Sequence, residues 1–213
     1  MFIPQLIELG EGLSSFVVGS EGNISLRTDS GFIIKASGKT LKGMKEDSSV
    51  ECDIEGVRLQ NQINKPSMET SFHSWIYKNS NFKVIAHTHP TNTLKILSTD
   101  YIHEFSYERL FPDHAVFNGE EACVVPYATP GLSLTKEVCR SVNSFKERCG
   151  YFPNLLLLQN HGLICCANSV NEAIIMTEIC EKAAEIFIGS KSLGSVNVLS
   201  DFDVECIINH DDE

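Results

Sequence analysis

Two histidines separated by one residue, His87 and His89, have the types and spacing to bind one metal ion. They follow the apolar run 82–86, which predicts a β-strand. Side chains at i and i+2 of a strand project to the same face, so the two imidazole nitrogens can share a cation. H-x-H is a short motif, and the alternative interpretation is an exposed strand end that carries two ordinary histidines.

A third histidine, His161, precedes Gly162 between the apolar runs 155–159 and 163–167. The glycine permits a tight turn and the close approach of a ligand. Three neutral imidazoles are a known catalytic zinc set, because they leave the metal its full charge and an open coordination position. A zinc hydrolase is one class that uses such a set, although the H-E-x-x-H motif is absent.

The predicted helix 69–78 contributes two more polar residues. Glu69 lies in its first turn, where the simplest role for an acid is to complement the helix dipole. His73 lies one turn later on the same face, and we expect it to pack in the helix or to support a site indirectly.

Two turns rich in glycine and serine, residues 19–25 and 36–40, carry amides and hydroxyls that can hold a phosphate. Neither matches the Walker or dinucleotide-binding pattern. Taken separately, each turn fits a hairpin better than a phosphate site.

The elements that must position these residues alternate between helix and strand without a strict βαβ rhythm. This favours a mixed α/β sandwich over a doubly wound parallel sheet. The periodicity predicts helices at 2–18, 69–78, 132–149 and 170–188, and strands at 23–27, 31–36, 82–86, 115–117, 122–126, 155–159 and 163–167. The segment 98–114 has no clear pattern, and the last helix is expected to end at Gly189.

Composition narrows the class of protein. A chain of 213 residues with 42% apolar content is long enough for one well-buried core. Its net charge of −11 disfavours binding to nucleic acid or to an anionic membrane surface. No run approaches the roughly 20 apolar residues of a membrane span, and the first residues lack a secretory pattern, so we expect a soluble cytoplasmic protein. The eight cysteines include no C-x-x-C pair and are expected to be reduced core residues.

Six motifs occur in a specific order along the chain. They are G-S-E-G-N-I-S (19–25), S-G-K-T (37–40), K-P-S-M-E (65–69), H-T-H-P (87–90), V-P-Y-A-T-P-G (125–131) and L-Q-N-H-G-L (158–163). Together they resemble the class II aldolase and adducin family over about residues 5–190. The resemblance implies a domain at 1–190 with a mixed, largely antiparallel central sheet flanked by helices in three layers. A partly packed tail with an acidic end would follow at 191–213.

The resemblance also assigns roles by position. The family's metal ligands fall on His87, His89 and His161, and its acid–base carboxylate falls on Glu69. Its contacts to the substrate phosphate fall on Asn23, Ser37, Gly38 and Ser67.

Two positions of the family pattern leave alternatives open. Met68 stands where related aldolases carry a second serine, so the substrate is either a sugar phosphate or an unphosphorylated sugar. The loop expected to supply a proton donor, often near a subunit boundary, offers three candidates: Tyr107, Asp113 and His114.

The function that the resemblance implies is a zinc-dependent aldolase, which cleaves or forms a carbon–carbon bond in a small sugar or sugar phosphate. Cleavage beside a ketone leaves an enediolate, and a cation is suited to stabilise its negative oxygens. The alternatives are a pentulose-phosphate 4-epimerase and a non-catalytic module like the adducin head. The resemblance further implies a homotetramer, and another divalent transition metal can replace zinc.

Overall fold

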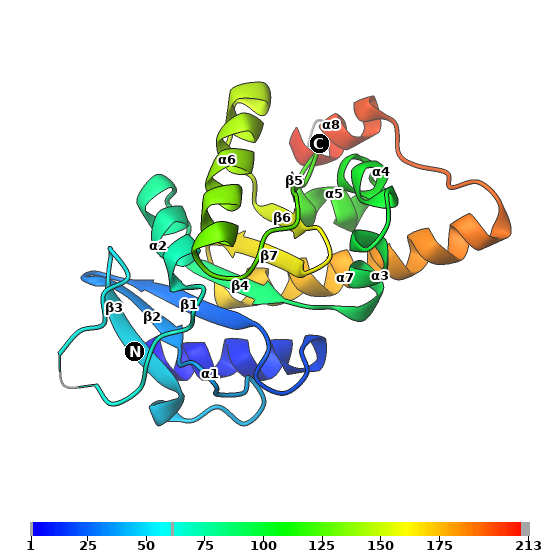
Figure 1. Cartoon of the computed structure of the whole chain (residues 1–213). Helices are drawn as coiled ribbons and strands as arrows, with labels where there is room; N and C mark the ends of the chain where they lie inside the picture. The colour runs from blue at the N-terminus through cyan, green and yellow to red at the C-terminus, as the bar shows by residue number, and fades with distance from the viewer. Residues whose placement is uncertain (1, 61, 210–213) are drawn as a thin grey trace.

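The computed structural model describes residues 2–60 and 62–209, which form a seven-stranded sheet with helices on both faces (Figure 1). The expected acidic end of the tail lies outside the described residues. The strand order is β3-β2-β1-β4-β7-β6-β5, and every described neighbouring pair is antiparallel except β5 with β6. The strands are β1 (Asn23–Thr28), β2 (Gly31–Lys35), β3 (Ser49–Asp53), β4 (Val84–Thr88), β5 (Cys123–Val125), β6 (Leu155–Leu158) and β7 (Gly162–Ala167).

The helices form two layers, with α1 and α7 on one face of the sheet and α2 and α6 on the other (Figure 1). They are α1 (Phe2–Leu13), α2 (Thr70–Asn79), α3 (Thr91–Leu97), α4 (Tyr101–Tyr107), α5 (Pro112–Asn118), α6 (Leu132–Cys149), α7 (Val170–Leu193) and α8 (Asp201–Asn209). Two 3₁₀ turns, η1 (Ser14–Phe16) and η2 (Glu46–Ser48), complete the described elements.

The three layers follow from the alternation of side chains along each strand. In β6, Leu155 and Leu157 join the core beneath α7, whereas Leu156 and Leu158 join the core beneath α2 and α6. A strand buried on both faces reads as a continuous apolar run, and this explains the sequence of four leucines. The predicted fold, a mixed and largely antiparallel sheet between helical layers, is confirmed.

The middle of the chain differs from the prediction. Residues 115–117 were expected in a strand but lie in α5, because Pro112 opens a helix there and Gly119 closes it with φ 76°. The unassigned segment 98–114 contains α4 and the first turn of α5. The three-residue apolar run fits a strand or a helix equally well. The proline at the start and the glycine at the end decide for the helix.

Both ends of the chain also differ from the prediction. The first helix ends at Leu13 and continues as a 3₁₀ turn to Phe16. The long helix α7 passes the expected stop at Gly189 and ends at Leu193. A glycine in an exposed helix interior costs only about 1 kcal/mol, and Lys191 stabilises the added turn through an ion pair with Glu104 of α4.

The tail beyond residue 190 contains α8, which packs against α5. Val204 of α8 is buried, and the backbone N–H of Leu199 donates to the carbonyl of Arg109 at 2.8 Å. The division into a domain at 1–190 and a tail at 191–213 remains a proposal. Among the described residues, no helix has the length and apolar character that crossing a bilayer requires.

Candidate metal centre

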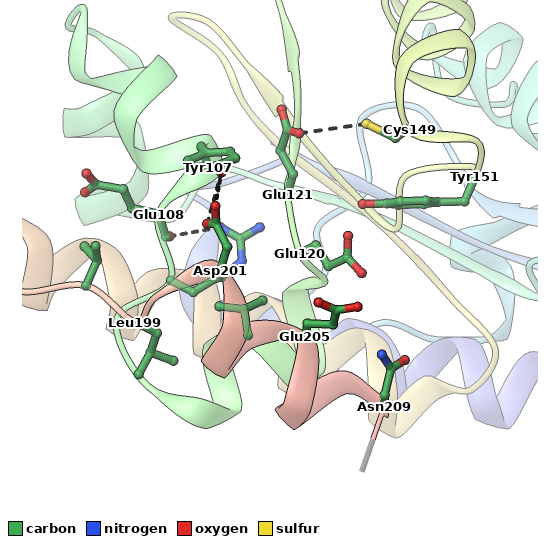
Figure 2. A pocket seen from close by; sticks show the side chains of 13 residues that line it. Tyr107, Glu108, Glu120, Glu121, Cys149, Tyr151, Leu199, Asp201, Glu205 and Asn209 are labelled. Carbon is green, nitrogen blue, oxygen red and sulfur yellow. Dashed lines mark hydrogen bonds between the residues drawn. The ribbon is translucent and has the colours of Figure 1, made fainter. Parts of the chain in front are cut away.

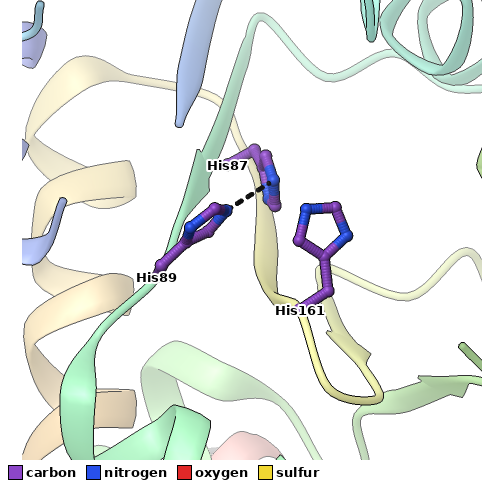
Figure 3. A group of neighbouring side chains, drawn as sticks. All are labelled: His87, His89 and His161. Atoms are coloured by element: carbon purple, nitrogen blue, oxygen red, sulfur yellow. Dashed lines mark hydrogen bonds between the residues drawn. The ribbon is translucent and has the colours of Figure 1, made fainter. Parts of the chain in front are cut away.

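The pairing of β4 with β7 brings the three histidines together. His87 pairs with Ile164 in the sheet, so the end of β4 lies beside the turn that carries His161. The turn is tight because Asn160 adopts a left-handed φ of 54°. The three rings point toward one another, with centroids 4.8 to 5.1 Å apart (Figure 3). The predicted convergence of His87, His89 and His161 is therefore present in the fold.

The hydrogen bonds of the rings select the tautomers that bind metal. Nδ1 of His87 donates to the carbonyl oxygen of Leu163 at 2.8 Å, which leaves Nε2 with its lone pair. Nδ1 of His89 lies 3.5 Å from Oε2 of Glu21, and this carboxylate favours the same tautomer.

The two Nε2 atoms of His87 and His89 face each other at 3.1 Å. Two lone pairs repel at that distance unless a cation lies between them. Tetrahedral zinc with bonds near 2.0–2.1 Å spaces its nitrogen ligands at about 3.3 Å. One ligand atom from each of His87, His89 and His161 lies within 4.8 Å of the others, so the donor set fits a metal ion.

The burial of the cluster keeps its histidines neutral. Desolvation lowers the pKa of His87 to about 3, assisted by the nearby His161 and Lys35 and opposed by the bond to Leu163. Desolvation and His87 lower the pKa of His89 to about 4, against Glu21 and Glu69. Desolvation also lowers the pKa of His161, opposed by Glu69 and assisted by His89. Neutral imidazole is the form that binds metal, so at neutral pH these side chains need lose no proton to bind one.

Glu69 completes the cluster from the N-cap of α2. Its Oε2 lies 3.4 Å from Nε2 of His87, and its Oε1 lies 3.7 Å from Nε2 of His161. Oε1 is buried without a hydrogen-bond partner. A buried carboxylate oxygen without a partner is costly, and its position suits contact with a cation or a reacting proton. Glu69 therefore lies beside the imidazoles of His87 and His161.

Three of the residues expected to contact phosphate lie on two chain segments that meet just before Glu69. Ala36 and Pro66 form a β-bridge, which places Ser37 and Gly38 next to the segment that holds Ser67. The hydroxyl oxygen of Ser67 accepts from the backbone N–H of Glu69 at 3.3 Å.

Asn23, the fourth residue expected to contact phosphate, is buried. Its amide lies between Glu69 and His73, with Nδ2 donating to Oε2 of Glu69 at 2.6 Å.

The three proton-donor candidates lie on α4 and α5. The exposed Tyr107 lines a surface pocket of about 440 Å³ beside α8 and donates from its hydroxyl to Asp201 at 3.0 Å (Figure 2). Asp113 is exposed in the first turn of α5. His114 is buried against the rings of Phe105 and Phe111. Among the described residues, Tyr107 bonds to Asp201 of α8 and His114 packs on Phe105 and Phe111, so both contact residues outside the cluster of three histidines.

Lys35, which belongs to none of the sequence motifs, is buried beside the cluster. Its Nζ donates to the carbonyls of Ser20 at 2.9 Å and Lys39 at 2.7 Å, so one ammonium connects the two glycine-rich turns. Desolvation lowers its pKa to about 8, partly offset by Glu69. The available signal was a lysine inside the apolar run of β2, since a fully buried lysine is rare.

A family model, the class II aldolase and adducin N-terminal domain, matches residues 10–188. The chain belongs to the class II aldolase and adducin family. In the family motifs, the two histidines of the H-T-H-P segment and the histidine of L-Q-N-H-G-L are the residues that meet in the fold.

Relatives within the class II aldolase and adducin family include enzymes. An L-fuculose phosphate aldolase of Methanococcus maripaludis is 28% identical over 180 residues, which are 84% of this chain and 90% of the relative. A 3-oxo-tetronate 4-phosphate decarboxylase of Pectobacterium atrosepticum is 27% identical over 190 residues, covering 86% and 83%. These relatives support an enzyme of the aldolase or lyase type.

Among solved structures, an L-fuculose 1-phosphate aldolase superposes with a TM-score of 0.82 at 24% identity. The superposition covers 99% of this chain and 96% of the other. At this identity, the likeness supports the fold that the family match also gives.

Proposed function

We propose that this chain is a metal-dependent aldolase that cleaves a small ketose phosphate reversibly. The observation that carries the proposal is the arrangement of three neutral imidazoles around one point, with an unpartnered oxygen of Glu69 beside them. Zinc is the metal we propose, because three histidines with an open position are a known catalytic zinc set. Imidazole also suits iron and copper, and elemental analysis of the purified protein identifies the bound metal.

A bound cation would supply positive charge for the oxygens that become negative as the carbon–carbon bond breaks. Glu69 would move the proton to and from the carbon of the ketone fragment, since a positioned carboxylate can act as a general base. Its Oε1 is the atom for that transfer, because Oε2 already accepts from Asn23.

The substrate phosphate would contact the Ser37-Gly38 turn and Ser67, which lie side by side near Glu69. The ammonium of Lys35, buried behind these turns, would favour an anion there. The names of both relatives specify phosphorylated substrates, which supports a phosphate ester over a free sugar. Exposed Met68 would replace the second serine contact with an apolar one.

For the donor of a proton to the departing aldehyde fragment, we propose Tyr107. Its hydroxyl is exposed, whereas His114 is enclosed by aromatic rings. In the homotetramer that we also propose, Tyr107 would serve the site of a neighbouring subunit. Analytical ultracentrifugation measures the number of subunits in that assembly. We also propose that the protein is cytoplasmic.

A second candidate function is the decarboxylation of a phosphorylated 3-oxo acid, favoured by the Pectobacterium relative. Loss of carbon dioxide from such an acid and cleavage of a ketose both leave an electron pair beside a carbonyl group. The same charge stabilisation therefore serves either reaction, and the products distinguish them.

The test is incubation with L-fuculose 1-phosphate, followed by detection of dihydroxyacetone phosphate and lactaldehyde. We expect a chelator to abolish the activity and zinc to restore it. Glu69→Gln should reduce kcat by about 10²- to 10⁴-fold with unchanged metal content, whereas Glu185→Gln at an exposed position of α7 should not. Full activity of Glu69→Gln, or release of carbon dioxide from a 3-oxo acid without cleavage of any ketose phosphate, would contradict the aldolase proposal.

A further inference from the structure

A line of buried polar side chains runs from Glu69 into the core between α2 and β1. Nε2 of His73 bonds to Oδ1 of Asn23, and Nδ1 of His73 lies 2.7 Å from Oγ of Ser25. Oγ of Ser25 lies 2.8 Å from the hydroxyl of Tyr77. Each of these side chains is almost completely buried.

The line has a simple origin in the sequence. Glu69, His73 and Tyr77 are spaced at i, i+4 and i+8, which places them on one face of α2. Asn23 and Ser25 are spaced at i and i+2, which places them on one face of β1. The helix face and the strand face meet, and the polar groups alternate between them.

The hydrogen bonds in this line all have the same direction. The carboxylate of Glu69 only accepts, so the amide of Asn23 must turn its Nδ2 toward it and its Oδ1 toward His73. Oδ1 also only accepts, so Nε2 of His73 carries the proton. Burial lowers the pKa of His73 well below its ordinary value, with a further contribution from His87. The ring is neutral, and its Nδ1 is therefore an acceptor.

The remaining donors follow from the same reasoning. Ser25 donates its hydroxyl proton to Nδ1 of His73, and Tyr77 donates to Ser25. The guanidinium of Arg27 lies 4.7 Å from the centre of the Tyr77 ring. That guanidinium is in turn held by the carbonyls of Tyr77, Ser80 and Phe82. The far end of the line is thus fixed to the backbone.

We propose that His73 is a positioning residue for the proton transfer by Glu69. It fixes the orientation of the Asn23 amide, which holds Oε2 of Glu69 and leaves Oε1 turned toward His161. This inference rests on the proposed function of Glu69.

Apolar side chains could fill this part of the core without the desolvation cost of polar groups. Buried polar groups contribute little to stability unless each has a hydrogen-bond partner. In this line, the side-chain N and O atoms all have a partner except Oε1 of Glu69. The single unsatisfied oxygen lies 3.7 Å from Nε2 of His161, whereas Oε2, 3.4 Å from Nε2 of His87, is held by Asn23.

Two variants separate the donor function of His73 from its packing. The amide nitrogen of glutamine reaches about as far as Nε2, so His73→Gln keeps a donor for Asn23. The amide of asparagine reaches only as far as Nδ1, so His73→Asn keeps a partner for Ser25 and loses the donor to Asn23. Ile76→Ala, in the same buried helix but outside the polar line, controls for general destabilisation.

The measurement is the exchange of the donor C–H proton of dihydroxyacetone phosphate with D₂O, followed by NMR, together with kcat, KM and metal content. We expect His73→Asn to slow exchange and kcat by about 10- to 100-fold, as misplacement of a reacting group does. KM and metal content should stay unchanged. His73→Gln should recover most of the rate, and Ile76→Ala should retain it. A loss equal in His73→Asn and His73→Gln, or equal in His73→Asn and Ile76→Ala, would overturn the proposal.

A second readout is independent of turnover. Nitrogen-15 NMR of the wild-type protein should show His73 as the neutral Nε2–H tautomer. Hydrogen exchange of the Asn23 side-chain amide should accelerate in His73→Asn and stay slow in His73→Gln. An Nδ1–H tautomer would refute the positioning role even in an active enzyme. A wild-type protein with the expected tautomer but without exchange or cleavage would instead refute the proposed function, and with it the catalytic consequence of the line.

Discussion

At the scale of single residues, the histidines of this chain differ in what lies against their two ring nitrogens. His87 gives one nitrogen to a backbone carbonyl and turns the other toward the cluster. His73 has both nitrogens occupied by side chains. His114 is enclosed by aromatic rings, and its Nδ1 receives only a long contact of 3.4 Å from the backbone N–H of Leu110. The same residue type therefore occupies three different environments.

His114 should make the protein sensitive to acid. Burial lowers its pKa well below the ordinary value, and nearby Arg109 adds to the effect. In the unfolded chain this imidazole binds a proton below about pH 6.5, whereas in the folded chain it stays neutral. As the pH decreases below about 6.5, His114 lowers the free energy of unfolding by at most about 1.4 kcal/mol per pH unit. Above about pH 6.5 it has no such effect.

We expect His114→Gln, which cannot be protonated, to flatten the pH dependence of the free energy of unfolding between pH 6.5 and 5.5. Urea unfolding at several pH values measures it for both proteins. The clustered histidines His87, His89 and His161 contribute equally to the two curves, so the difference between slopes reports His114. Parallel curves would show that this histidine accepts a proton in the folded state.

At the scale of elements, the cluster of three histidines depends on how closely β4 approaches the turn before β7. Gly162 pairs with Leu158 across that turn. A Cβ at Gly162 would lie 2.4 Å from the carbonyl oxygen of Thr88 and 2.6 Å from the ring of His89. Any side chain there must push the two strands apart, so the glycine sets the distance between the histidine pair and His161.

Gly162→Ala should destabilise the fold by about 1–3 kcal/mol through overpacking. It should also weaken zinc binding by about 10- to 100-fold, because the ligands lose their supporting contacts. Gly189→Ala is the matched control, since nothing lies within 4 Å of its added Cβ in α7. That variant should stabilise the protein by about 0.5–1 kcal/mol.

Urea unfolding and a competition titration with a zinc chelator measure both variants. Unchanged zinc affinity in Gly162→Ala would mean that the turn relaxes without moving the ligands.

At the scale of the whole molecule, one sheet separates two cores, and the strands β2, β4, β6 and β7 contribute buried side chains to both. Leu156 and Leu157 are adjacent in β6 and face opposite cores. Removal of either side chain must therefore weaken the same strand. The two helical layers are not independent units, although they do not share a core.

Leu156→Ala and Leu157→Ala should each cost about 2–5 kcal/mol, the usual range for a buried leucine. In both variants, one cooperative transition should shift as a whole. Fluorescence of Trp75, the single tryptophan, reports the α2 layer, and far-UV circular dichroism reports the helices of both layers. If Trp75 fluorescence changed before the circular dichroism in Leu156→Ala, the layers would unfold separately.

The sequence by itself determined which side chains share a face within each helix and strand. The spacing of His87 and His89 placed two imidazoles on one face of a strand, and the spacing of Glu69 and His73 placed two polar groups on one face of a helix. The order of the family motifs indicated the fold, which the structure confirmed. The faces on which these side chains lie do not depend on distant contacts, because they follow from backbone geometry alone.

Only the tertiary structure decided what those faces meet. The register of β4 with β7 brings His161 to His87, and the contact of α2 with β1 buries Glu69 beside Asn23. Lys35 became part of the site for the same reason, since its carbonyl partners lie in loops that only the fold brings together. Such contacts depend on which pairing of faces buries the most apolar surface over the whole chain, and no local pattern contains that information.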